Sequence, residues 1–280
     1  MKKVLKVFGV SLTIVIIIGL VFVAFNIDRL KRLHAVNTLF AEDKIVANFS
    51  NMKGAFAYAP IVENGEVEPW GTALKSLPKT YPQAGKEKST NLWLDESKTT
   101  SFMVVQDGLV TYESYYLDTK PDDLRISWSI AKSFLSAAFG VAVQEGLINI
   151  NDPVDKYVPA LKKSAYNGVT VRNVLNMSSG VKFDENYLDF WSDIKKMGRV
   201  LAIGGSMDEF STEVKERERE QGVARQYVSI DTHVLSMVLR AATGKRLIQY
   251  VGEKIVEPIG FDDPLITRPI AKEMHLHWVV

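Results

Sequence analysis

The sequence contains no cysteine. Disulfide bonds, thiolate zinc sites and a cysteine nucleophile are therefore excluded, although many exported proteins share this absence and it does not indicate a compartment. Histidine is also scarce, with His34, His233, His275 and His277 scattered along the chain. His275 and His277 are two positions apart, which makes a weak ligand pair. We therefore expect no metal site and no cofactor.

An excess of charge of either sign is absent as well. The 34 Lys and Arg residues are balanced by 33 Asp and Glu residues, which leaves a formal net charge of +1. This balance gives no support to a nucleic-acid or polyanion partner. The 280 residues are 46% hydrophobic and 24% charged, which is typical of a globular protein with a sizeable core.

One long hydrophobic run is present, close to the N-terminus. From Val7 to Phe25 the chain is apolar except for Ser11 and Thr13. This length suits a hydrocarbon core of about 30 Å, whereas a cleavable signal peptide has an apolar region of about 7–15 residues. No clear cleavage site follows. The run predicts a single uncleaved transmembrane helix, with the N-terminus inside and the rest of the chain facing the periplasm or cell exterior; a buried core helix is the alternative.

The remaining chain mixes a strand pair with several helices. Residues 101–106 and 109–116 are β-branched and aromatic, and the Asp107-Gly108 pair between them favours a type I′ hairpin turn. The continuous apolar first strand indicates a sheet buried on both faces. Residues 42–88, rich in Pro and Gly, predict an extended lead-in. Helical spacing and end signals predict helices over residues 129–144, 171–177, 231–242 and 247–256; residues 92–97 fit a helix or a loop.

Ser129 and Lys132 stand at the start of the first of these helices. Residues three apart share one helix face, and an amine within reach of a hydroxyl activates a weak nucleophile. A free lysine has a pKa near ~10.4, so Lys132 needs desolvation or a nearby cation to serve as a base. The apolar helix that follows supplies desolvation, and the helix N-terminus favours an oxyanion. A helix cap followed by a surface lysine is the alternative interpretation.

The segments around this pair occur in a specific order. Residues 127–133, 144–148, 151–159 and 169–180 together resemble the serine β-lactamase-related family, which includes class C β-lactamases, penicillin-binding DD-peptidases, esterases and 6-aminohexanoate-dimer hydrolases. The match runs from about Ser101 to Gly260, and Trp128 before the serine resembles the last branch. The resemblance implies an α+β fold, an antiparallel sheet packed with helices plus a helical subdomain, and hydrolysis of an amide or ester through an acyl-enzyme.

The resemblance also assigns roles to residues in this sequence. Ser129 is the expected nucleophile and Lys132 its base, and Tyr227 in the segment Tyr227-Val228-Ser229 corresponds to the family's Tyr-x-Asn motif. Tyr227 is then expected to relay the proton to the leaving group. Ser229 replaces the usual asparagine and, with Trp128, is expected to bind substrate. Glu185 is a candidate for the edge of the substrate pocket.

A third family motif, Lys-Thr-Gly or His-x-Gly on a strand near the C-terminus, is not found. His275-Leu276-His277-Trp278 has no glycine, and residues 265–280 no longer resemble the family. We therefore expect a truncated member without the closing strands, divided into an anchor (1–27), a lead-in (28–90) and an incomplete hydrolase domain (91–280). Two hypotheses follow: a membrane-anchored serine hydrolase of a small amide or ester, or an inactive, membrane-tethered binding module. The oligomeric state stays open.

Overall fold

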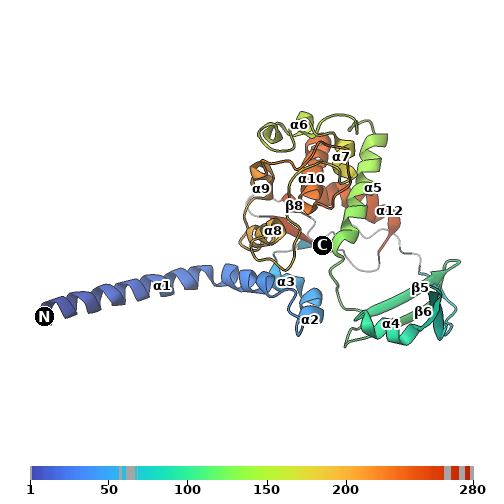
Figure 1. Ribbon diagram of the computed structural model, residues 1–280, viewed down its shortest axis with the longest axis horizontal. Coiled ribbons are helices and arrows are strands. Elements are labelled where there is room, and N and C mark those ends of the chain that lie inside the picture. The colour runs from blue at the N-terminus through green and yellow to red at the C-terminus, as the bar shows by residue number, and fades with distance from the viewer. Residues whose placement is uncertain are drawn as a thin grey trace.

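A long N-terminal helix extends from one side of a helical body, and a small β-region lies on the other side (Figure 1). The computed structural model describes residues 2–56, 59–60, 67, 69–261, 266–270 and 275–277. The long helix, α1, spans Lys2–Asn37, and its segment Ser11–Asn37 is long and apolar enough to cross a membrane. A signal sequence meets the same test, so the predicted apolar helix is confirmed, whereas its insertion in a membrane stays a prediction.

The body and the β-region are built from short elements. The other helices are α2 Ile45–Ser50, α3 Met52–Ala55, α4 Thr90–Glu96, η1 Trp128–Ile130, α5 Ala131–Gln144, α6 Val154–Tyr157, η2 Pro159–Lys163, α7 Val171–Leu175, α8 Asp193–Ala202, α9 Met207–Glu213, α10 Ser229–Thr243, α11 Leu247–Val251, η3 Gly252–Val256 and α12 Glu257–Ile259. The strands are β1 Ala59–Pro60, β2 Gly71–Thr72, β3 Thr80–Gln83, β4 Lys86–Ser89, β5 Ser101–Gln106, β6 Leu109–Tyr115, β7 Ile266–Ile270 and β8 His275–His277.

Helix α10 is the centre of the body. Its residues from Ser229 to Leu239 are all buried, and it contacts α5, α6, α7, α9 and α11. A helix buried on every side needs apolar residues all round, and its polar side chains need partners. The helix ends where Gly244 adopts a φ of +65°, so the predicted glycine stop is confirmed.

Helix α5 packs beside α10 through one face. Leu135, Ala138, Phe139 and Ala142 are buried, at the spacing of successive turns on one side of a helix. Gly140 on the other side is exposed. The predicted helix is therefore confirmed, although residues 128–130 ahead of it form a separate 3₁₀ turn.

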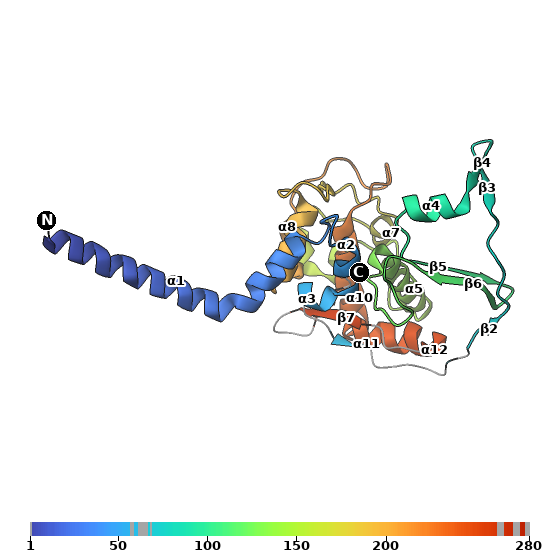
Figure 2. The same ribbon diagram turned by 90° about the horizontal axis from the view of Figure 1, so that it is seen from below.

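The β5–β6 hairpin is confirmed, but its predicted burial is wrong. Asp107 and Gly108 have φ values of +53° and +76°, as a type I′ turn requires. The sheet, in the order β2-β6-β5, lies beside the helical body rather than inside it (Figure 2). Met103 and Val105 of β5 are 48% and 39% exposed. The aromatic side of β5 is covered, since Trp93 of α4 packs on Phe102 with ring centroids 5.8 Å apart.

Two other expectations hold only in part. The lead-in is not purely extended, because residues 42–88 contain α2, α3 and the β3–β4 hairpin; residues 57–58, 61–66 and 68 lie outside the described residues. Of the two stop signals predicted after the last helix, Pro258 and Gly260, only Gly260 ends the helical run, with a φ of +76°. Pro258 lies inside α12, because Pro is tolerated in a first helical turn. The described C-terminal residues pair as an antiparallel sheet in the order β1-β7-β8.

Candidate active site

Ser129 is presented by a strained turn. Trp128, directly before it, has a φ of +45°, which is uncommon for a residue with a bulky side chain and costs about 1–3 kcal/mol. The indole is held by two rings: its centroid lies 5.5 Å from that of Phe40 and 5.2 Å from that of Phe49. This packing keeps the turn in place at the entrance to α5.

Three predicted catalytic side chains meet at this turn. The Lys132 Nζ atom donates to Ser129 Oγ at 3.3 Å, and the Tyr227 hydroxyl shares a short hydrogen bond with the same oxygen. The Lys132 nitrogen also lies 5.5 Å from the centroid of the Tyr227 ring. Tyr227 comes from the segment just before α10, so the packing of α10 against α5 joins residues far apart in sequence. A hydroxyl, an amine and a phenol arranged in this way can pass a proton among themselves.

Ser229 is tied to Glu185. The Glu185 carboxylate accepts a hydrogen bond from the Ser229 backbone N–H, and its Oε2 atom accepts from Ser229 Oγ at 3.1 Å. Burial raises the pKa of the Glu185 carboxyl. A hydroxyl has one proton to donate, so with that proton on Glu185, Ser229 has only acceptor capacity left for a substrate. Glu185 therefore contributes to the site by fixing the position of Ser229.

Two further residues at the site were missed in the sequence. Tyr187 lines the space beside Ser129, its ring centroid lies 5.8 Å from that of Phe40, and burial raises its pKa to about 12. Lys195 of α8 has its ammonium 5.7 Å from the centroid of the Phe40 ring, and burial lowers its pKa. Tyr187 lies in an irregular polar stretch and Lys195 in an amphipathic helix, so no sequence motif marks either one.

An apolar pocket opens next to Ser129. Its empty volume, with the solvent at its open mouth included, is about 930 Å³. The walls come from the end of α1 and the residues after it, from the residue that follows α3, and from α8, α9 and α10. Trp128, Ser129, Lys132 and Ser229 also line it. The apolar lining side chains are Val36, Leu39, Phe40, Phe56, Ile194, Met197, Leu201 and Met207.

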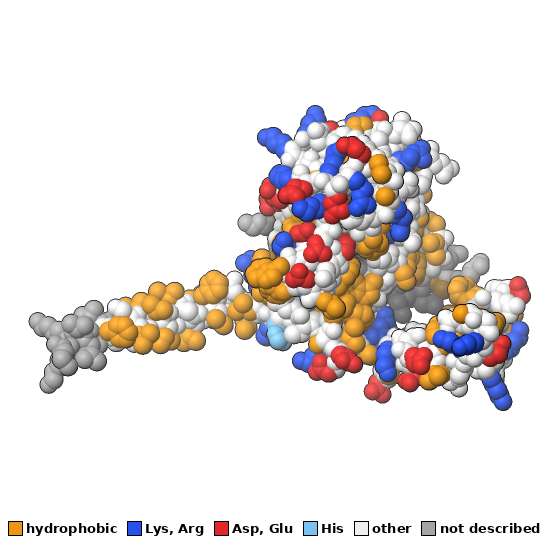
Figure 3. All heavy atoms as spheres, viewed as in Figure 1, with side chains coloured by type: hydrophobic (Ala, Val, Ile, Leu, Met, Phe, Trp, Pro, Cys, Tyr) orange, Lys and Arg blue, Asp and Glu red, His pale blue; other side chains and the backbone are white. Residues whose placement is uncertain are grey.

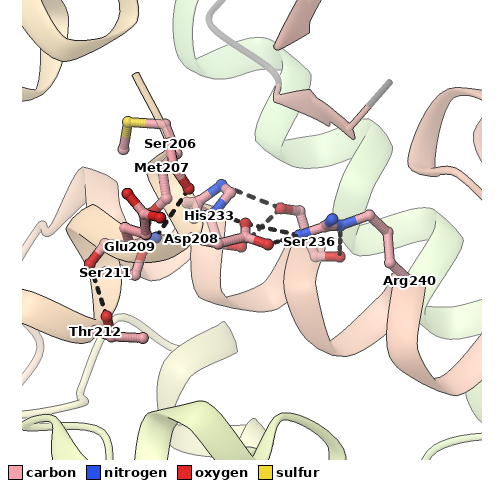
Figure 4. Close-up of polar contacts among 9 residues, drawn as sticks. All are labelled: Ser206, Met207, Asp208, Glu209, Ser211, Thr212, His233, Ser236 and Arg240. Atoms are coloured by element: carbon pink, nitrogen blue, oxygen red, sulfur yellow. Dashed lines mark hydrogen bonds and ion pairs between the residues drawn. The ribbon is translucent and has the colours of Figure 1, made fainter. Parts of the chain in front are cut away.

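A partly buried polar cluster joins α9 to α10 at the pocket wall (Figure 4). His233 Nε2 lies 2.8 Å from Asp208 Oδ1, and Arg240 also donates to Asp208 at 2.8 and 3.0 Å. Ser236 Oγ is 3.3 Å from His233 Nδ1, which gives a Ser-His-Asp order. The Ser236 hydroxyl donates instead to the His233 carbonyl at 2.7 Å, so its proton is not held toward the imidazole. We interpret the cluster as a structural link between the two helices.

The residues that the structure describes include no group of three or more His, Asp or Glu side chains that could hold a metal ion.

A sequence model of the Beta-lactamase family matches residues 95–280, more than half of the chain. The chain belongs to the β-lactamase family.

Relatives of this β-lactamase family member include hydrolases. A 6-aminohexanoate-dimer hydrolase from Paenarthrobacter ureafaciens is 30% identical over 164 residues, which cover 56% of this chain and 41% of that enzyme. A solved structure from Bacillus anthracis, assigned as a 6-aminohexanoate-dimer hydrolase, superposes with a TM-score of 0.69 at 19% identity and covers 85% of this chain and 65% of that one.

A second solved structure, from Bacteroides dorei and assigned as a β-lactamase, has a TM-score of 0.51 at 20% identity and covers 68% of this chain and 55% of that one. These superpositions show the β-lactamase-like α+β fold. The chain spans less than two thirds of the length of each of these three proteins.

Proposed function

We propose that this family member is a serine hydrolase that cleaves an amide or ester bond through an acyl-enzyme. The observation that carries the proposal is the convergence of Lys132 and Tyr227 on Ser129 Oγ. Chance rarely brings an amine and a phenol onto one serine oxygen beside an open pocket, and the hydrolase relatives support the same chemistry.

The reaction uses each of the three groups. Ser129 Oγ attacks the substrate carbonyl carbon, and its proton passes to Lys132, directly or through the Tyr227 oxygen. The tetrahedral intermediate collapses when Tyr227 protonates the leaving amine or alcohol, which leaves the acyl group on Ser129. A water molecule, deprotonated by the same pair, then attacks the ester carbonyl; the bond between the acyl carbon and Ser129 Oγ breaks, the pair returns the proton to Oγ, and the acid is released. The substrate is a small molecule, and the chemistry requires no cofactor.

Trp128 and Ser229 complete the proposed site as substrate-binding residues. The Trp128 ring stacks on Phe40 at the pocket lining, so it offers an apolar surface beside the nucleophile. The Ser229 oxygen, whose proton is engaged by Glu185, accepts a hydrogen bond from an N–H of the substrate.

We place this hydrolase at a membrane, with α1 as a single-pass anchor and the catalytic part on the periplasmic or outer side. The exposed apolar helix supports this location by its length and composition. Figure 3 draws apolar side chains along the helix up to the body.

A fluorophosphonate probe tests the nucleophile. The full chain should be labelled, and Ser129→Ala should not be labelled. Ser136→Ala, an exposed serine later in α5, is the matched control and should be labelled like the wild type. Equal labelling of wild type and Ser129→Ala would refute the proposal. A folded wild-type chain without labelling and without ester turnover would favour the alternative, an inactive binding module.

A further inference from the structure

We infer that the pocket beside Ser129 is an acyl-chain site, which makes this protein selective for esters or amides of linear, uncharged acyl groups longer than acetyl. The inference rests on the proposed function and adds the substrate class. The occupant is the acyl part of the substrate, because the pocket is continuous with the serine that attacks its carbonyl.

The shape of the pocket fits a chain. Ser229, Thr232, His233 and Ser236 all line it, so it follows α10 for two turns from the catalytic end. Seven residues of helix rise about 10 Å. The facing wall is α8, from Ile194 to Leu201, and the end of α1 lies across it. A space that follows α10 for this length and has apolar residues on its facing wall is suited to an extended alkyl chain.

The charges at the pocket disfavour a cationic chain. Lys132 and Lys195 both line it, whereas its lining contains no Asp or Glu among the residues that the structure describes. The nearby carboxylate of Glu185 is engaged by Ser229, and that of Asp208 by His233 and Arg240. A terminal ammonium would therefore lie near two amines with no anion to pair with. An uncharged methyl end carries no such penalty.

Lipid-facing and pocket-lining residues belong to one helix. The exposed apolar segment of α1 begins at Ser11, and Val36 of the same helix is 4% exposed and lines the pocket. Residues Leu39 and Phe40, just past the helix, complete that wall. A substrate with an alkyl chain partitions into a bilayer, so a pocket walled by the end of α1 receives it close to where it is concentrated.

The test measures chain-length selectivity of the full chain in lipid nanodiscs, with p-nitrophenyl esters from acetate to octanoate. Burying a methylene is worth about fourfold in kcat/KM, so activity should rise by about that factor per carbon until the pocket is full. The hexanoyl ester should exceed the 6-aminohexanoyl ester at least tenfold. Acetyl turnover without any rise, or with a preference for the aminohexanoyl ester, would overturn the inference while leaving the proposed function in place.

Two variants show whether the pocket causes the selectivity. Gly198 of α8 lines it, and a Cβ there would lie 3.3 Å from Val36 Cγ1, so Gly198→Leu fills the space where α1 meets α8. The octanoyl-to-acetyl ratio should fall at least tenfold. Gly140→Leu makes the same change on the exposed face of α5 and should keep the wild-type ratio. Lipid partitioning is the same for both variants, so an unchanged ratio in folded Gly198→Leu would contradict the inference.

Ile194→Asp adds the missing carboxylate in the first turn of α8, a position that tolerates a negative charge. This variant should shift the ratio of 6-aminohexanoyl to hexanoyl turnover at least tenfold toward the amino compound, and no shift would count against the site.

Binding to Ser129→Ala separates the inference from catalysis. Calorimetry in nanodiscs should show octanoate binding more tightly to Ser129→Ala than to Ser129→Ala with Gly198→Leu, even if the wild type hydrolyses nothing. In that case the acyl site stands and the proposed function fails. Equal affinity of both variants for octanoate would overturn the acyl site.

Discussion

At Ser129 two different groups compete for one proton. Lys132 donates to the serine oxygen at 3.3 Å, and the phenol of Tyr227 is hydrogen-bonded to the same oxygen. Because Lys132 also lies near the phenol ring, Tyr227 is placed to pass the proton between Ser129 and Lys132. Removing the phenol oxygen alone therefore tests the relay without disturbing the aromatic packing.

Tyr227→Phe should lower kcat for an ester substrate by about 10²–10⁴, the usual contribution of a positioned acid or base. Stopped assays with the wild type and the variant, together with thermal unfolding, measure this loss. Tyr81→Phe is the matched control, since Tyr81 lies in β3 and packs against Trp93 away from the site. If Tyr227→Phe keeps full kcat, the relay through the phenol is wrong.

The helix that carries most of the core, α10, also buries a carboxyl group. Asp231 is fully buried, and its Oδ1 atom accepts hydrogen bonds from Tyr166 at 2.7 Å and Ser179 at 3.0 Å. Its Oδ2 atom has no hydrogen-bond partner among the described residues. Burial raises the pKa of Asp231 to about 7. The folded state therefore holds this proton up to near-neutral pH, whereas an unfolded Asp loses it near ~3.9.

This difference predicts how stability depends on pH. The stabilisation from the protonated Asp231 carboxyl is fully present below the pKa of the unfolded group, and it is lost as the pH rises through about 7. Between these values the folded state binds more protons, so the free energy of unfolding falls by up to about 1.4 kcal/mol per pH unit. Asp231→Asn should remove this slope, as denaturant unfolding at pH 5, 6 and 7 would show. Asp95→Asn, on the exposed surface of α4, should keep it; a wild-type slope in Asp231→Asn would disprove the assignment.

Local patterns predicted the elements that local chemistry determines. Thr170 caps α7 by accepting from the Asn173 N–H, and Asp107-Gly108 forms its turn, because both depend on neighbouring residues only. The prediction that β5 is buried on both faces was wrong, because burial depends on what packs against each face of a strand, and apolar residues alone do not indicate it. Ser129 and Lys132 were found by spacing, and Tyr227 by resemblance.

The pocket was not predictable in this way. Its walls join the end of α1 to α8 and α10, both of which lie more than a hundred residues later in the sequence, and that packing follows no periodic signal. Lys195 and Tyr187 belong to the site only because α8 and the segment before it face Phe40. The positive φ of Trp128 is likewise imposed by tertiary packing, since nothing in the sequence of a tryptophan favours it.

For the whole molecule, the continuity of α1 sets the distance between a bilayer and the site. The apolar run ends at Phe25, and Val36 at the pocket follows eleven residues later in the same helix. Eleven residues of helix rise about 16 Å. The end of α1 is fixed to the body, because Arg32 donates to the Ala202 carbonyl at 3.0 Å and α1 packs against α8. An anchored protein therefore holds Ser129 near the membrane surface.

Deleting residues 2–25 tests the anchor and spares this packing, because Arg32, Val36 and the residues after them remain. The full chain should stay with membranes through an alkaline wash and have the mass of the uncleaved sequence, whereas the deleted form should be soluble and hydrolyse the acetyl ester within about threefold of the full chain. A lower mass, from cleavage after the apolar run, would make α1 a signal sequence and contradict the anchor. The pocket would survive that outcome, since its walls begin at Val36. The part of the octanoyl advantage that comes from sharing a membrane with the substrate should then be lost, whereas the part that comes from burying the chain in the pocket should remain.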